Sequence, residues 1–416
     1  MPDAEFEPLW EFVEEHLDEA EFLWGTWERS LVAPQYSLAE VAEGPEARLI
    51  AHIDGLVVNG PLVARKMLIP ALEEDEPDRV SAAAAALLQA PRESGGRDAV
   101  FEALREMPEQ RPPLVRALCC VADPELLTRI RGLLIDEDSG LVAAAAEVLA
   151  FHFQPLGDTL GLLLASEAVD ARVVALRAVA TESEPGRFVR AVQAGLTDAD
   201  PRIVDAAIET GVRLHLAAAW GRARTRAEDA DGGGSMLLLA LRAEASDQAF
   251  LSAALRDRKR RLAALWALGF LGTPKAVDDS LEWLEEAATG PLAGEVFTAV
   301  TGVDLEEAKI SLSVEEDEEA LEWRAEDDLP RPNPMDVMQC WMKLRGNFAV
   351  GQRYVRGAVR SPSNLLVALT DGQMRRPTHL LDLELHAAAK DRPRLQVRAP
   401  TSRQLAQLAQ HDRSGT

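Results

Sequence analysis

Cysteine and tyrosine are scarce in this chain of 416 residues, which contains 3 cysteines and 2 tyrosines. Two of the cysteines, Cys119 and Cys120, are adjacent, and the third is Cys340. An odd number of cysteines, two of them adjacent, excludes a small fold that is held together by disulfide bonds. It favours a protein of the reducing cytoplasm. Aromatic residues make up only 5% of the chain, and alanine and leucine supply most of the apolar mass. This composition favours packed helices over sheets.

Long apolar runs are also absent. None approaches the ~20 residues that span a bilayer, and the longest candidate, residues 236–241, is one or two helical turns. The acidic amino terminus has neither the basic nor the apolar region of a signal peptide. We therefore expect a cytoplasmic protein that does not insert into membranes.

Motifs of metal sites, cofactor sites and known catalytic sites are missing. The histidines are scattered, and His379 and His386 lie seven residues apart on one expected helix, which is too far for a shared ion. The three glycines at 232–234 lack the Lys-Ser/Thr pair of a phosphate-binding loop. The sequence contains no nucleophile elbow or dinucleotide fingerprint. We expect no catalytic residue, no metal and no cofactor.

Basic residues are outnumbered, with 44 Lys+Arg against 69 Asp+Glu and a net charge of −25. The charge is uneven, because residues 335–416 contain 13 Lys+Arg and 6 Asp+Glu, a net of +7, so the remainder carries −32. An acidic surface repels phosphate backbones. Nucleic-acid binding is therefore not expected of the part before residue 335.

A helical motif that returns at a fixed interval is the strongest feature present. Val80, Val142, Val173 and Val204 are separated by 62, 31 and 31 residues, so the period is 31. An Asp-rich turn precedes an alanine-rich helix in each clear copy, and Asp is a favoured helix cap. A period in this range predicts stacked helix pairs, an α-solenoid.

Composition divides the rest of the chain. The segment 222–235 has three glycines and no apolar periodicity, which indicates a flexible loop. The segment after residue 302 has clustered carboxylates and prolines, which indicate a linker. The expected domains are an N-terminal helical cap at 1–68, a repeat array at 69–302, an acidic linker at 303–334, and a small basic helical domain at 335–416.

Residues 4–29 predict an amphipathic helix, with a possible break near Gly25. Its tryptophans allow two interpretations, a solenoid cap with one solvated side or a helix that binds a partner. Basic residues of the C-terminal part allow either an internal contact with the acidic linker or docking on an acidic partner. The candidate partner-binding residues are Trp24, Trp27, Arg353, Arg356, Arg360, Arg375 and Arg376. We expect the two tryptophans to be exposed at the end of the array and the arginines to belong to a basic surface.

The repeats resemble HEAT repeats, both in the Leu-x-Asp-x-Asp turn and in the Ala-Leu-Gly-x-Leu-Gly ending at residues 267–272. Four blocks, at residues 12–24, 48–56, 293–302 and 351–357, resemble those of a family of uncharacterised bacterial HEAT-repeat-like proteins. Members of that family are often encoded in type VI secretion gene clusters. The resemblance implies an accessory role near a contractile secretion machine and implies no catalytic residues.

These observations predict an all-α, HEAT-like α-solenoid with a small helical C-terminal domain. Our leading hypothesis is a non-enzymatic adaptor or assembly factor that binds protein, in or near type VI secretion. The alternative is a hydrolase or lyase with its site in the solenoid groove. A third hypothesis is nucleic-acid binding through residues 335–416. A deep pocket with convergent polar groups would favour the enzyme, and a broad, shallow surface the adaptor.

Overall fold

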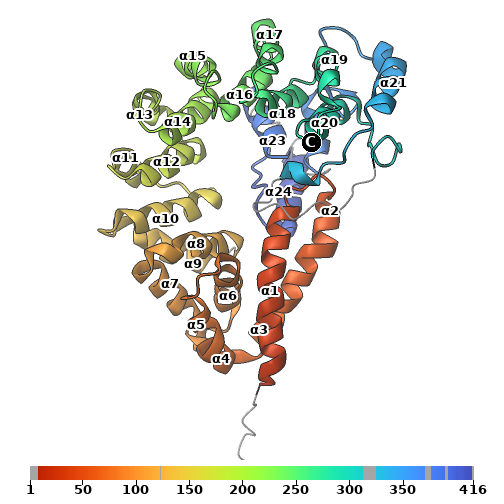
Figure 1. The fold of residues 1–416 in the computed structure, drawn as a ribbon. Helices are drawn as coiled ribbons and strands as arrows, with labels where there is room; N and C mark the ends of the chain where they lie inside the picture. The colour runs from red at the N-terminus through yellow and green to blue at the C-terminus, as the bar shows by residue number, and fades with distance from the viewer. Residues whose placement is uncertain (1–7, 122, 313–324, 371–375, 389–391, 415–416) are drawn as a thin grey trace, which may run out of the picture. The chain divides into compact units, whose positions relative to one another are not determined.

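The protein is an all-α solenoid of HEAT-like helix pairs with further helices at its C-terminal end (Figure 1). The computed structural model describes residues 8–121, 123–312, 325–370, 376–388 and 392–414. The chain forms two compact units. Unit 1 comprises Met1–Leu31, Ala39–Thr210 and Gln396–Ala406, and unit 2 comprises Val32–Leu38, Gly211–Leu395 and Gln407–Thr416.

Unit 1 is built from successive antiparallel helices. Its helices are α1 (Trp10–Ser30), α3 (Ala47–Val58), α6 (Pro77–Gln89), α7 (Gly96–Glu106), α8 (Arg111–Cys120), α9 (Pro124–Gly132), α10 (Ser139–Phe151), α11 (Thr159–Leu164), α12 (Val169–Ala178), α13 (Val189–Gly195) and most of α14 (Pro201–Arg213). The short helices α2 (Leu38–Val41), α4 (Gly60–Val63) and α5 (Ile69–Ala71) precede and follow α3 along the chain. Helices α6, α8, α10 and α12 pack on one another in order, and α7, α9 and α11 each pack on the helix that follows.

Alanine makes this stacking close. The run on α6 is buried, and Ala145 and Ala146 of α10 have no exposed surface, which confirms that the alanine-rich helices face their neighbours. A side chain of one carbon lets two helix backbones approach closely and fills the space without a cavity.

Aspartates in the turns start α9 and α10, as the repeat pattern predicts, whereas α6 and α12 begin without a side-chain cap. The Asp138 carboxylate accepts hydrogen bonds from the backbone N–H groups of Gly140 and Leu141 at 2.8 and 3.2 Å. Arg111 of α8 also pairs with this carboxylate, and that hydrogen bond is the main reason that the pKa of Asp138 is lowered. Arg172 pairs in the same way with Asp198 at 2.6 Å. These arginines therefore link each repeat to the next.

The N-terminal helix differs from the prediction in two respects. Helix α1 is continuous through Gly25, and Trp24 and Trp27 are each only 2% exposed, so the expectation that these rings lie on the surface is wrong. Both rings lie on the side of α1 that packs against α3 and α6. Gly25 serves close packing, because a Cβ there would lie 2.5 Å from Oδ2 of Asp78.

Unit 2 continues the repeats with α15 (Ala217–Arg226), α16 (Gly233–Arg242), α17 (Ala245–Ala254), α18 (Arg261–Leu271), α19 (Pro274–Ser280) and α20 (Gly290–Thr301). Helices α16, α18 and α20 form its stack. The prediction of a flexible loop at 222–235 is wrong at both ends of that segment, because both ends are helical. Only residues 227–232 form a turn. The buried Arg226 holds this turn by pairing with Asp229 and Asp231.

The C-terminal part of unit 2 contains α21 (Pro334–Leu344), a hairpin of β1 (Tyr354–Val355) and β2 (Ala358–Val359), α22 (Pro362–Ala368) and α23 (Arg376–His386). The hairpin was not predicted. Residues 313–324 of the predicted linker lie outside the described residues, and its two flanks form a bridge between Ser311 and Pro332. The last helix, α24 (Thr401–Ser414), begins in unit 1, so residues 335–416 do not group as one compact body.

Candidate functional site

The hairpin of unit 2 lies across the C-terminal ends of two stacked helices. Tyr354 N–H donates to the carbonyl of Gly272 at 2.7 Å, and Arg356 N–H donates to that of Ala299 at 2.7 Å. Gly272 follows α18 with a φ of +68°, and a Cβ there would lie 2.4 Å from the Tyr354 carbonyl oxygen. The glycine that ends the Ala-Leu-Gly-x-Leu-Gly motif is therefore required for the hairpin to dock.

Arg353, just before the hairpin, adds further hydrogen bonds to the stacked helices. Its guanidinium donates to carbonyls at the end of α18 (Leu271 and Phe270, both 3.0 Å) and to carbonyls at the end of α16 (Leu241 at 3.2 Å and Ala240 at 3.4 Å). Burial lowers its pKa to about 10, so the group stays charged at neutral pH. The expectation of a surface arginine is wrong here, because Arg353 caps two helices whose last carbonyls have no partner within the helix.

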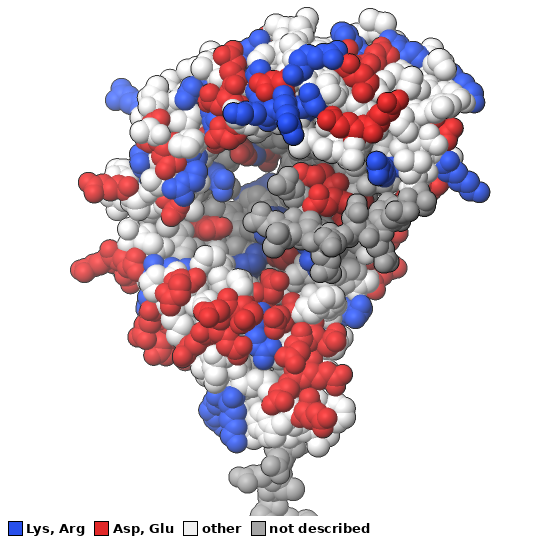
Figure 2. All heavy atoms as spheres, viewed as in Figure 1, with Lys and Arg blue, Asp and Glu red and all other residues white. Residues whose placement is uncertain are grey.

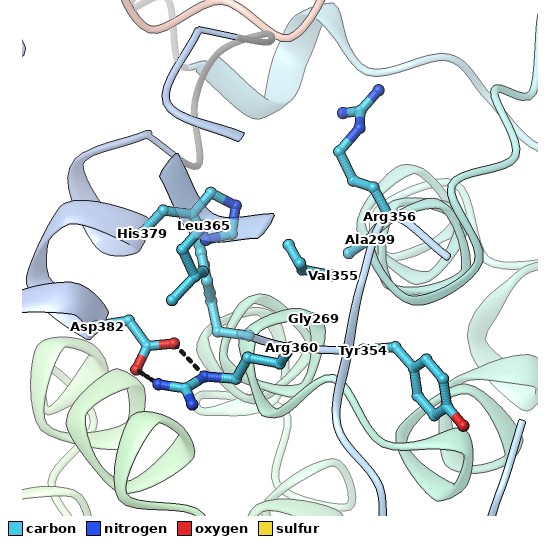
Figure 3. A pocket seen from close by; sticks show the side chains of 10 residues that line it. Gly269, Ala299, Tyr354, Val355, Arg356, Arg360, Leu365, His379 and Asp382 are labelled. Atoms are coloured by element: carbon cyan, nitrogen blue, oxygen red, sulfur yellow. Dashed lines mark hydrogen bonds and ion pairs between the residues drawn. The ribbon is translucent and has the colours of Figure 1, made fainter. Parts of the chain in front are cut away.

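A second arginine of the predicted set is also engaged inside unit 2 (Figure 3). Arg360 Nε donates to Asp382 Oδ2 at 2.7 Å, and its Nη2 pairs with Oδ1 of the same carboxylate. His386 Nδ1 lies 2.9 Å from Asp382 Oδ1. Burial alone would raise the pKa of Asp382, but the hydrogen bonds from His386 and Arg360 outweigh it and lower that pKa to about 2.

This polar cluster is not arranged for catalysis. The cavity beside it, between Phe270, His379 and Asp382, has a volume of about 10 Å³, hardly enough for one water. A carboxylate with a pKa of about 2, held by two partners, is a poor general base. Asp382 and Arg360 therefore fix α23 to the hairpin.

The other arginines of the predicted set have separate positions. Arg356 is exposed, and Figure 3 shows its side chain pointing away from the Arg360–Asp382 pair. Arg375 lies outside the described residues. Arg376 begins α23, and its side chain lies outside them too.

Unit 1 has a larger hollow, an open depression of about 530 Å³. The C-terminal half of α1, the starts of α6 and α8, and the segment after residue 395 provide its walls. The lining residues are Trp24, Glu28, Asp75, Pro77, Asp78, Ser81, Glu109, Gln110, Pro112, Pro113, Arg116 and Arg398. Figure 2 shows acidic side chains gathered over the helices of unit 1 on the face drawn.

Charge in the depression is only partly balanced. Glu28 pairs with Arg116 and, at 3.0 Å, with Arg398. Within the described chain, no Lys or Arg pairs with Asp75, Asp78 or Glu109, although all three line the depression. The pKa of Asp78 is raised, first by burial and then by the negative charge of Glu28. The depression therefore has an excess of negative charge where a carboxylate is already partly desolvated.

The two tryptophans of α1 have different roles. Their rings meet edge to face with centroids 5.5 Å apart. Trp27 Nε1 donates to the buried Glu46 carboxylate at 2.8 Å, so Trp27 belongs to the core. Trp24 lines the depression, and its Nε1 has no hydrogen-bond partner among the described residues. Of the predicted pair, Trp24 alone borders the hollow, with 2% of its surface exposed.

The segment after residue 395 is docked in unit 1 through contacts that sequence analysis missed. Thr401 donates from its N–H (2.9 Å) and from its hydroxyl (2.6 Å) to the Glu46 carboxylate. Arg403 donates to the Cys119 carbonyl at 3.1 Å and to His152 Nδ1 at 3.3 Å. Thr401 and Glu46 are 355 positions apart in the sequence, and no local sequence pattern predicts a contact over that separation.

His152 is neutral in this contact, with its proton on one defined nitrogen. Its Nε2 lies 3.1 Å from the Leu118 carbonyl, which can only accept, and its Nδ1 faces Arg403, which can only donate. Burial lowers the pKa of His152 to about 4, and the charge of Arg403 adds to this.

No three His, Cys, Asp or Glu side chains of the described chain gather in a group that could hold a metal ion. None of the described helices combines the length and the apolar character needed to cross a lipid bilayer.

Comparisons with known proteins give weak structural similarities. No family model matches the chain, and no curated protein matches it. The X-ray structure of YibA from Escherichia coli is similar at a TM-score of 0.30 and 13% identity, over 72% of this chain and 99% of that one. The structure of human deoxyhypusine hydroxylase in complex with glycerol is similar at a TM-score of 0.20 and 16% identity, over 67% of this chain and 94% of that one. At these levels the similarity carries no conclusion about what this chain does.

Proposed function

We propose that the protein is a non-enzymatic adaptor that binds a protein partner through the depression of unit 1. The depression itself carries this proposal. It is open and about 530 Å³ in volume, and it combines an indole ring, three prolines and several carboxylates. Three of these, Asp75, Asp78 and Glu109, form no ion pair within the described chain, although the charge of Arg29 acts on Asp78. Binding energy at protein interfaces concentrates where an aromatic side chain lies in a pocket that the partner can fill and dehydrate.

The enzyme alternative has less support. Nucleophilic or acid–base catalysis needs a matched pair of groups, such as a nucleophile beside its base. Asp78 has a raised pKa, but the residues that line the depression include no His, Cys or Lys, and the hydroxyl of Ser81 donates to the Pro113 carbonyl. The cluster around Asp382 in unit 2 has almost no room for a substrate. Neither of these two hollows therefore offers a good position for a hydrolase or lyase site.

Nucleic-acid binding through residues 335–416 is also less well supported. Arg353 and Arg360 direct their guanidinium groups to carbonyls and to Asp382 inside unit 2. A phosphate backbone is bound by exposed cations that can replace its counterions. These two arginines are not available for that role.

The sequence blocks at 12–24, 48–56, 293–302 and 351–357 suggest which partner the adaptor binds and in which compartment. Their resemblance to proteins encoded beside type VI secretion genes supports a cytoplasmic partner that belongs to that machine. Partner and compartment are both part of the proposal.

Affinity capture of the tagged full-length protein in its own host, with mass spectrometry, tests the function. We compare wild type with Asp78→Arg in the depression and with Asp54→Arg, a matched reversal at an exposed position of α3. We expect a defined partner to be lost with Asp78→Arg and kept with Asp54→Arg. Equal recovery of the same proteins by all three would contradict the proposal.

A further inference from the structure

We propose that the depression of unit 1 accepts a basic peptide segment, with a Lys or Arg side chain at Asp78 and a main-chain carbonyl at the indole N–H of Trp24. The inference rests on the proposed function and names the chemistry of the partner. Two independent observations carry it, one from charge and one from an unused hydrogen-bond donor.

The first observation is the excess negative charge. Asp75 and Asp78 come from the turn that starts α6, Glu109 comes from the turn before α8, and none pairs with a cation of the described chain. Helix starts tolerate carboxylates, because the N-terminal end of a helix is partly positive. The raised pKa of Asp78 shows that burial and Glu28 outweigh that effect. A ligand cation at Asp78 would relieve this repulsion.

The second observation is Trp24. Its side chain is 98% buried, its ring lines the depression, and its Nε1–H has no acceptor among the described residues. Water still reaches this N–H, and a bound peptide can replace that water with a main-chain carbonyl as acceptor. Pro77, Pro112 and Pro113 form apolar surface beside it, which suits the methylene stem of a Lys or Arg side chain.

The chain contains an example of this mode of binding at the edge of the same depression. Arg398 donates to the Glu28 carboxylate at 3.0 Å, while its own carbonyl accepts from Arg116 Nη2 at 2.8 Å. A basic residue of a non-helical segment is thus held by a carboxylate at its side chain and a donor at its backbone. Asp78 and Trp24 offer the same pair of groups to a segment from outside.

Direct binding to the full-length protein provides the test. The probe is a fluorescein-labelled 12-residue peptide with four arginines spaced by alanine and leucine, measured by anisotropy, and its counterpart has glutamate in place of arginine. We expect the arginine peptide to bind, more tightly at low salt, and the glutamate peptide not to bind. Exposed and half-buried ion pairs contribute up to about 1 kcal/mol, which is roughly fivefold in affinity. Asp78→Asn should weaken binding by about that factor, and Asp75→Asn/Asp78→Asn/Glu109→Gln by more than tenfold.

Nonspecific attraction to an acidic protein is controlled by removing the same charge elsewhere in unit 1. The triple variant Asp54→Asn/Glu93→Gln/Glu102→Gln alters three exposed carboxylates away from the depression and should bind like wild type. Trp24→Phe keeps an aromatic ring in the core and removes only the donor, and it should weaken binding several-fold. Circular dichroism would confirm that each variant is folded.

Gly25→Ala tests the position of Asp78 without any change of charge. The new methyl would lie 2.5 Å from Asp78 Oδ2, so the carboxylate must move. We expect affinity to fall about threefold. The control is Gly161→Ala in α11, where a Cβ would meet no atom within 4 Å.

The inference is overturned if the two peptides bind equally, or if both triple variants lose affinity to the same extent. If neither peptide binds while partner capture still depends on Asp78, the partner is not basic and the adaptor function stands. If capture is also indifferent to Asp78, the inference and the proposed function fail together.

Discussion

Arg353 offers the sharpest test of how unit 2 is held together. Its side chain is 17% exposed, and its guanidinium spans the ends of α16 and α18, with hydrogen bonds of 3.0 Å to the carbonyls of Leu271 and Phe270. Hydrogen bonds from a charged donor contribute about 1.5–3 kcal/mol each, so these two represent roughly 3–6 kcal/mol. Water can reach part of the site after the side chain is removed, and we therefore expect Arg353→Met to cost about 3 kcal/mol.

Thermal melting of the full-length protein measures this cost. Unit 2 contains roughly 200 residues, and for that size 1 kcal/mol shifts a midpoint by about 2–4 °C, so its transition should fall by about 6–12 °C. Arg353→Lys should recover part of the loss, because one ammonium cannot serve both helix ends. The control is Arg258→Met at an exposed position of unit 2. A shift no larger than that of the control would refute the capping role of Arg353.

Two further predictions concern unit 1. Protonation of His152 would place a second N–H donor opposite the guanidinium of Arg403. The pKa of His152 is lowered from 6.5 to about 4 in the folded state. The folded state therefore keeps its full stability above pH 6.5, and that stability decreases as the pH falls towards 4. At about 1.36 kcal/mol per pH unit the full effect is on the order of 3 kcal/mol, of which about 2 kcal/mol is reached at pH 5. The exchange of residues 396–406, after correction for the intrinsic amide exchange rate at each pH, should therefore increase from pH 7 to pH 5 more in wild type than in His152→Gln, and an equal increase would exclude this coupling. Ala145→Trp should overpack the α10 contacts and lower the melting midpoint of unit 1 by an amount equivalent to about 1–3 kcal/mol, and an unchanged midpoint would mean that α10 is not stacked as described.

The repeat architecture could be predicted from the sequence because its causes are local. An alanine run predicts close helix packing, and Asp138 in a turn predicts a helix start, whatever the rest of the chain does. Both features return with the repeat, so each copy supports the next. The paired arginine Arg111 lies only 27 residues away, within one repeat, and belongs to the same periodic pattern.

The candidate site could not be predicted in the same way, because its contacts join distant parts of the chain. Arg353 looked like a surface cation, yet the carbonyls that it caps lie 82 to 113 residues earlier. Trp24 and Trp27 looked exposed because the end of an array has unused surface, but α3 and α6 cover them. Asp78 was predicted only as part of an acidic turn, and its role depends on Gly25 and Glu28 of another helix.

Site-specific photo-cross-linking tests the central claim most directly. A benzoylphenylalanine residue replaces Pro112, an exposed residue at the edge of the depression, or Glu102, an exposed residue of α7. The full-length protein is irradiated in its host, and cross-linked peptides are identified by mass spectrometry. We predict that position 112 cross-links to one protein partner, at a peptide that contains Lys or Arg, and that position 102 does not. Cross-linking of that partner from position 102 with none from position 112 would contradict the assignment of the depression as the binding site.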